Sequence, residues 1–181
     1  IAAHNGFGTH GHDNMEILTC VLKGAISHKD SMGNAGDIKP GERQLMSAGT
    51  GVRHSEINQY DEDVHLFQIW IIPNVKDAEP TYQQIQLDPK DAPNQWHLIA
   101  GPNENAPMHL RQDAEVKTAV LEAGQSLDVN KTQTFNYIHV VEGEVEIAGQ
   151  TVKTGDALMF DENSTVKANQ NTQMIWFDLP R

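Results

Sequence analysis

The chain has 181 residues, of which 13 are lysine or arginine and 25 are aspartate or glutamate, so its formal charge is −12. It contains neither a cluster of basic side chains for nucleic-acid phosphates nor an apolar run of the roughly 20 residues that a membrane-spanning helix needs, so neither nucleic acid nor membrane is expected as a partner. A single cysteine, Cys20, excludes an internal disulfide framework and, with no signal peptide, favours a cytoplasmic protein.

Short apolar runs rich in β-branched and aromatic residues alternate with Gly, Asn, Asp and Pro, a pattern typical of an all-β sandwich or barrel. The stretch Val64–Ile72 is apolar on both alternating faces, which predicts a strand buried on both sides. Pro73–Pro80 is expected to be a linker or excursion. In chain order, the predicted strands are Ile17–Leu22, Ala25–Lys29, Gln44–Ala48, Val52–Ile57, Val64–Ile72, Tyr82–Leu87, Trp96–Ala100, Glu115–Leu121, Phe135–Val141, Glu144–Ala148, Ala157–Phe160, Thr165–Ala168 and Met174–Asp178.

A faint internal repeat suggests two copies of one β-unit. The strand that ends at Gly24 resembles the strand that ends at Gly143, and the turn around Gly41 resembles the turn around Gly155. Two unrelated hairpins with similar turns are the alternative interpretation. The repeat predicts two β-barrel domains, 1–80 and 81–181.

Two pairs of potential metal ligands have the spacing of one face of a strand. His10 and His12 are two residues apart, and so are His54 and Glu56. Residues two apart in a strand point to the same side, so pairing of these strands would bring imidazoles and a carboxylate together. Mixed nitrogen and oxygen ligands suit a first-row transition metal. In a chain with nine histidines such pairs also arise by chance.

These residues carry a family resemblance. The segment from Gly8 through His10, His12 and Glu16 to Gly24 resembles the first cupin motif, with shortened spacing before the histidines, and His54 to Asn58 resembles the end of the second. More narrowly, several segments resemble the pirin family, including bacterial pirin-like proteins: GFGTHGH from Gly6, DSMGN from Asp30, MSAGTGVRHSE from Met46, FQIWI from Phe67 and FDLP from Phe177. These matches span nearly the whole chain.

The resemblance implies an all-β bicupin, meaning two cupin barrels, with a metal in the N-terminal barrel. Carried onto this sequence, the pirin ligands are His10, His12, His54 and Glu56, whereas other cupins would use Glu16 in place of Glu56. We expect one divalent transition metal per chain, iron first, with manganese, nickel, copper, cobalt or zinc as alternatives. The chain begins at Ile1, and pirins usually carry residues before this point, so we expect an upstream part of the family fold to be missing here.

The repeat also predicts that the C-terminal barrel is metal-free. Aligning Gly143 with Gly24 and Gly155 with Gly41 places poor ligands opposite His10, His12, Glu16, His54 and Glu56, namely Val129, Lys131, Phe135, Ala168 and Gln170.

Pirin-like proteins are similar to quercetin 2,3-dioxygenases, which implies a flavonol-like aromatic substrate and O2. Glu56 would be both a ligand and the catalytic base that takes the proton of the flavonol 3-hydroxyl. The alternative is a metal-binding regulatory protein that acts through protein–protein contacts, as eukaryotic pirin does. A flavonol-sized cavity at the metal would favour the enzyme. Isomerase or decarboxylase chemistry, as in other cupins, would need further charged groups in the pocket.

Five further histidines lack a motif partner and are expected to be structural, that is, surface or hydrogen-bonded rather than ligands: His28, His65, His97, His109 and His139. Cys20 is predicted to be a buried apolar residue. The three tryptophans, Trp70, Trp96 and Trp176, are expected in the core or at an interface.

Overall fold

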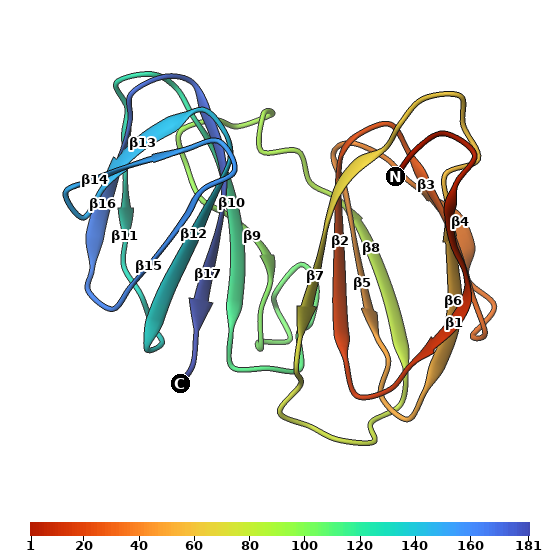
Figure 1. Cartoon of the computed structure of the whole chain (residues 1–181). Coiled ribbons are helices and arrows are strands. Elements are labelled where there is room, and N and C mark those ends of the chain that lie inside the picture. Colours follow the sequence, from red (N-terminus) through yellow and green to blue (C-terminus); the bar gives the residue numbers. More distant parts are fainter. The chain divides into compact units, whose positions relative to one another are not determined.

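The computed structural model describes residues 1–181 and contains strands, turns and loops but no helix, as expected for an all-β chain (Figure 1). No element is therefore a helix long and apolar enough to cross a membrane. The chain divides into two compact units, the first formed by residues 1–88 and 110–112 and the second by 89–109 and 113–181. The expected boundary at residue 80 differs from this division because β8 (Thr81–Gln86) pairs with β5 (Glu42–Ser47) of the first unit.

Two four-stranded antiparallel sheets form the first unit. One sheet has the order β1-β6-β3-β4, with bounds β1 (Gly6–His12), β6 (Val52–Ile57), β3 (Ile26–Asp30) and β4 (Ala35–Ile38). The other has the order β7-β2-β5-β8, with β7 (His65–Ile71) and β2 (Glu16–Lys23). Val52, His54 and Glu56 are buried while the alternate residue Arg53 is exposed, so one face of β6 points inward.

The second unit repeats this arrangement. Its sheets have the orders β15-β12-β17-β10-β9 and β11-β16-β13-β14. If β11–β17 are matched with β1–β7, the matched strands pair with one another in the same way, which confirms the two-copy interpretation. The additions differ: β8 extends the first unit at β5, and β10 and β9 extend the second at β17. The matched turns share a left-handed glycine, with φ of 85° at both Gly41 and Gly155. The strands are β9 (His97–Ala100), β10 (Glu115–Leu121), β11 (Ser126–Val129), β12 (Phe135–Glu142), β13 (Glu144–Ile147), β14 (Gln150–Lys153), β15 (Ala157–Phe160), β16 (Ser164–Ala168) and β17 (Thr172–Leu179).

The expectation that the strand Val64–Ile72 is buried on both faces is wrong. Its Trp70 does not lie in the core, so for this residue the interface alternative stays a prediction. Strand β7 lies at the edge of its sheet and pairs only with β2, and most of its residues are half-buried rather than buried on both faces. Trp70 in this strand is 55% exposed, whereas Trp176 is buried and Trp96 packs against the core of the second unit. An apolar composition on both faces of a strand therefore does not distinguish a central strand from one at the edge of a sheet.

The segment Pro73–Pro80 is an excursion that is fastened to the first unit. The Thr50 amide donates to the Ala78 carbonyl oxygen at 2.9 Å. A Cβ atom at Gly49 would lie 2.0 Å from that oxygen, and the φ of Gly49 is 48°, so glycine is required for this close approach.

Candidate metal centre

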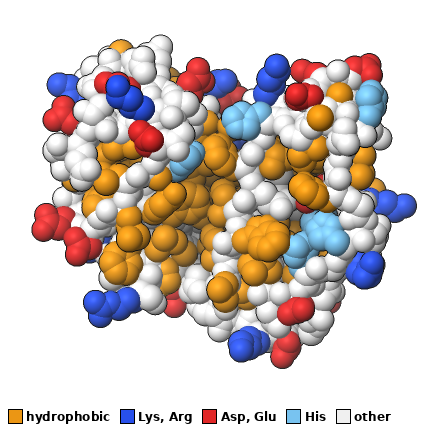
Figure 2. Space-filling model, viewed as in Figure 1, with side chains coloured by type: hydrophobic (Ala, Val, Ile, Leu, Met, Phe, Trp, Pro, Cys, Tyr) orange, Lys and Arg blue, Asp and Glu red, His pale blue; other side chains and the backbone are white.

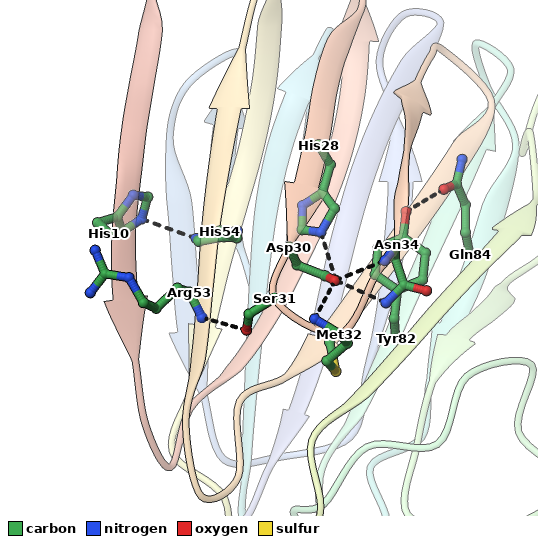
Figure 3. A network of polar contacts seen from close by, with 10 residues as sticks. All are labelled: His10, His28, Asp30, Ser31, Met32, Asn34, Arg53, His54, Tyr82 and Gln84. Atoms are coloured by element: carbon green, nitrogen blue, oxygen red, sulfur yellow. Dashed lines mark hydrogen bonds and ion pairs between the residues drawn. The ribbon is translucent and has the colours of Figure 1, made fainter.

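Pairing of β1 with β6 brings the two predicted ligand pairs together. His10 lies opposite His54, and a bulge between Phe7 and His10 places Phe7 opposite Glu56. On the other side of β6, strand β3 places His28 opposite Glu56 and Asp30 opposite His54. Residues directly opposite each other share a face of the sheet. Figure 3 shows His10, His28, Asp30 and His54 on these neighbouring strands. His28, Asp30, His54 and Glu56 are buried, whereas Phe7 is exposed.

The nitrogens of the histidines converge. His10 Nε2 and His54 Nε2 are 3.0 Å apart, and the ring of His12 lies 4.8 Å from that of His10 and 5.0 Å from that of His54, between centroids. Donor atoms of His10, His12 and His54 lie within 4.8 Å of one another, and so do those of His28, His54 and Glu56. The four residues predicted as ligands thus fall into two groups that share His54.

This donor set fits a divalent transition metal. His10 Nδ1 lies 2.8 Å from the Gly8 carbonyl oxygen, an acceptor, so Nδ1 carries the proton and Nε2 presents its lone pair. Two nitrogens bound at right angles to one ion at about 2.1 Å would be about 3.0 Å apart, which matches the His10–His54 separation of 3.0 Å. His12 Nε2 is buried and has no hydrogen-bond partner.

Burial keeps the central histidine neutral. Loss of solvent, followed by the charges of His10, His28 and His12, lowers the pKa of His54 to about 4, although Asp30 opposes the shift. Burial and then His10 also lower the pKa of His12. A neutral imidazole is the form that binds metal, so both side chains are ready to act as ligands at physiological pH.

Glu56 is the acid in the second of these groups, and Glu16 belongs to neither. Both Glu56 oxygens accept hydrogen bonds from Gln68 Nε2, each at 2.8 Å. Glu16 is buried elsewhere, where Ser47 Oγ donates to its Oε2 at 2.8 Å and the Arg111 amide donates to the same atom at 3.2 Å. Glu16 therefore holds the segment 110–112 against the first unit.

His28 was expected to be structural, but it lies in this cluster. Its side chain is fully buried and its Nε2 contacts Asp30 Oδ2 at 3.1 Å, while its Nδ1 has no partner. The signal in the sequence was His28 and Asp30 two residues apart, the same spacing as the two ligand pairs. Gln68 was also missed, because only the packing of β7 shows that it reaches Glu56.

Asp30 is held by a tight turn that fixes His28 (Figure 3). Its carboxylate accepts hydrogen bonds from the Met32 amide and from the amide and side chain of Asn34, each at 2.9 Å. Burial alone would raise the pKa of Asp30, but the hydrogen bonds from Asn34 and His28 outweigh it, and the pKa is lowered. The carboxylate thus stays charged and accepts a hydrogen bond from His28 Nε2.

The other histidines lie outside both groups. His65 is exposed on β7, and His97 Nε2 lies 2.7 Å from the Ala92 carbonyl oxygen. An open depression of about 470 Å³ adjoins His12 and is bounded by Ser31 and Arg53 among others, but no other predicted ligand lines it.

The second unit has neither histidine nor carboxylate at the positions that match the predicted ligands of the first. Val129 pairs with Ser164, as His10 pairs with His54, so the counterparts of His54 and Glu56 are Ser164 and Val166 rather than Ala168 and Gln170. The shift arises because Ser164 follows the glycine of its turn, Gly155, by nine positions, whereas His54 follows Gly41 by thirteen. Val129 and Val166 are fully buried in one core cluster. That the second unit is metal-free stays a prediction, now with a corrected register.

Comparison with known proteins covers both units. Residues 1–71 match the family model described as Pirin, and residues 98–179 match the quercetinase C-terminal cupin domain. A quercetin 2,3-dioxygenase of Escherichia coli K12 is 40% identical over 185 residues, which cover 99% of this chain and 79% of that protein. The crystal structure of Escherichia coli YhhW has a TM-score of 0.92 at 37% identity and covers 99% of this chain and 78% of that one. The same values of TM-score and identity hold for the bacterial pirin YhhW in complex with nickel(II), with coverages of 99% and 79%. The chain therefore belongs to the pirin family, and its two units are cupin domains.

Proposed function

We propose that this chain is a metal-dependent dioxygenase that opens the ring of a flavonol with O2. Its Escherichia coli relative is named quercetin 2,3-dioxygenase, which supports the proposal. The observation that carries the proposal is the 3.0 Å separation of His10 Nε2 and His54 Nε2 beside the buried carboxylate of Glu56. Buried polar groups normally have hydrogen-bond partners, and a shared metal ion would account for the unpartnered His12 Nε2 beside them.

His10, His12, His54 and Glu56 would hold one divalent ion, for which we propose iron. The nickel(II) complex of YhhW supports a divalent metal in this fold. When bound, the ion would act as a Lewis acid and orient substrate and O2 in the positions that four protein ligands leave open.

Glu56 is the group placed to take the proton of the flavonol 3-hydroxyl. Gln68 occupies one side of each carboxylate oxygen, and a carboxylate oxygen has further lone pairs to accept a proton. His54 stays neutral because its pKa is lowered to about 4, so it does not compete as a proton donor. Loss of the proton makes the flavonol an electron-rich enolate, and addition of O2 then yields the depside and carbon monoxide.

The test begins with protein purified without chelators, whose metal is identified by elemental analysis. The metal-loaded protein is then given quercetin in air, while quercetin absorbance, O2 uptake and carbon monoxide are measured. We expect one O2 consumed and one carbon monoxide released for each quercetin lost.

Variants at the centre make the test specific. Glu56→Gln is expected to lower turnover about 10²–10⁴-fold, the usual contribution of a general base, and His10→Ala to lower the metal content. His65→Ala is the matched control, because His65 is exposed and outside the cluster. Metal-loaded protein that leaves quercetin unchanged would refute the proposal and favour the regulatory alternative.

A further inference from the structure

Trp70 is a large aromatic side chain that the fold leaves uncovered next to the candidate metal centre. Its side chain is 55% exposed, and its ring lies 5.1 Å from that of His12 at an interplanar angle of 82°. Phe7 is 53% exposed and its ring lies 6.4 Å from that of His10. In Figure 2, hydrophobic and histidine side chains lie side by side on the surface of the first unit.

A hydrogen-bond chain connects Trp70 to the carboxylate of Glu56. The indole Nε1–H donates to Gln68 Oε1 at 3.1 Å, and Gln68 Nε2 donates to Glu56 Oε1 and Oε2 at 2.8 Å each. Trp70 and Gln68 are two residues apart on β7, so both side chains face the centre.

The indole N–H sets the orientation of the Gln68 amide. If the amide turned over, its oxygen would face the Glu56 carboxylate and its NH2 group would face the indole N–H, so acceptor would meet acceptor and donor would meet donor. A donor at Trp70 therefore keeps the Gln68 NH2 group on Glu56. That contact fixes the carboxylate and leaves its remaining lone pairs for a metal or a proton.

We propose that Trp70 is the platform on which the aromatic ring of the substrate stacks, and that Gln68 is a positioning residue that couples this platform to Glu56. The inference rests on the proposed function and deepens it, because it names a planar, hydroxylated aromatic ring as the feature recognised. An exposed indole offers such a ring a large apolar face. A ring stacked there would lie beside His12, and Gln68 links the platform to Glu56.

Three variants separate the two roles of Trp70. Trp70→Leu removes the ring and is expected to weaken quercetin binding about 5- to 10-fold, as loss of an aromatic stack does. Trp70→Phe keeps a ring but removes the N–H, so we expect KM within about twofold of the wild-type value and a lower kcat. Gln68→Leu is expected to lower kcat to the same extent.

The double variant Trp70→Phe/Gln68→Leu is the sharpest test of coupling. If the indole N–H acts only through Gln68, the kcat of the double variant is no lower than that of Gln68→Leu alone. If the two residues act independently, the fold-losses of kcat in the two single variants multiply in the double variant. Trp96→Phe is the matched control: Trp96 lies in the second unit and donates to the Asp128 carbonyl oxygen at 2.9 Å. It is expected to change neither binding nor turnover.

Binding is measured without turnover, by calorimetric titration of quercetin into zinc-loaded protein under argon, and kcat and KM are measured in air with iron-loaded protein. Wild-type protein that binds no quercetin would refute the proposed function itself. Wild-type binding that is unchanged in Trp70→Leu would refute the platform alone. A double variant whose fold-loss of kcat equals the product of the two single losses would refute the coupling through Gln68.

Discussion

Asp30→Ala is expected to destabilise the first unit strongly, because one carboxylate organises both a turn and a buried histidine. Asp30 is 8% exposed and accepts hydrogen bonds from the Met32 amide, from two donors of Asn34 and from His28, at 2.9 to 3.1 Å. Alanine would remove all of them and leave His28, whose Nδ1 is already unpartnered, without any partner.

The size of the effect follows from these contacts. Hydrogen bonds to a charged group contribute about 1.5–3 kcal/mol each, but these share one acceptor and water can reach part of the turn, so they do not add in full. Together with the unpaired buried imidazole, we expect a loss of about 3–5 kcal/mol in the free energy of unfolding of the first unit.

Each unit has its own tryptophans, so tryptophan fluorescence can report the unfolding of each unit. Urea unfolding of metal-free protein is followed by fluorescence, with Trp70 reporting the first unit and Trp96 and Trp176 the second. Only the transition of the first unit should move. Asp61→Ala is the control: Asp61 contacts His4 at 2.9 Å, but its side chain is fully exposed, so the transition should not shift.

The dependence on pH gives a second check. Because the pKa of Asp30 is lowered in the folded protein, its stabilisation is present above the ordinary aspartate pKa of about 3.9 and is lost as the pH falls below it. The difference between wild type and Asp30→Ala should therefore shrink in acid. A loss smaller than about 1 kcal/mol at neutral pH would refute the reasoning, because charged hydrogen bonds buried in a turn would then contribute almost nothing.

Three further predictions follow from single contacts. Glu56→Gln should weaken zinc binding at least about 10-fold in a chelator competition, since a ligand charge is lost, whereas Glu16→Gln should leave it near the wild-type value because Glu16 is outside the ligand groups. Burial raises the pKa of Cys20 to about 11, so a thiol reagent at pH 8 should react only after the protein unfolds, and reaction of the native protein would contradict the buried placement. In urea unfolding, Gly143→Ala should lower the free energy of unfolding far more than Gly155→Ala. A Cβ at Gly143 would lie 2.3 Å from Thr172 Oγ1, while one at Gly155 meets nothing within 4 Å. Equal losses of stability in the two variants would contradict this reasoning.

The strands were predictable wherever a run of apolar residues matched a face of a sheet. Val52–Ile57 and Glu115–Leu121 were predicted with their observed bounds. Three short strands, Ala35–Ile38, Ser126–Val129 and Gln150–Lys153, were not predicted. Each lies at the edge of a sheet, where one partner strand supplies the hydrogen bonds and few apolar residues are needed.

The site was predictable only as far as its members are close in sequence. The spacings of His10 with His12 and of His54 with Glu56 are local patterns that a strand converts into a shared face. His28 and Gln68 enter through the register of β3 on β6 and through packing between sheets, which no local pattern specifies. The same limit explains the misplaced counterparts in the second unit, where both a shorter strand, β15, and a shorter connection to β16 shifted the alignment.

The two cupin domains share a strand topology but differ in whether their apolar core is continuous. In the second domain, Val129, Ile147 and Val166 belong to one continuous core cluster. On β2 of the first domain, Ile17 and Val21 belong to different apolar clusters, and Thr19 lies between them on the same face, with its hydroxyl unpartnered.

The layer that interrupts the first core holds His28, His54 and Glu56, all buried. Buried polar groups without partners destabilise a fold, whereas an ion that binds only the folded state stabilises it. The domain that carries the donors should therefore be the one whose stability depends on metal, and the apolar domain provides the internal standard against which that dependence can be measured.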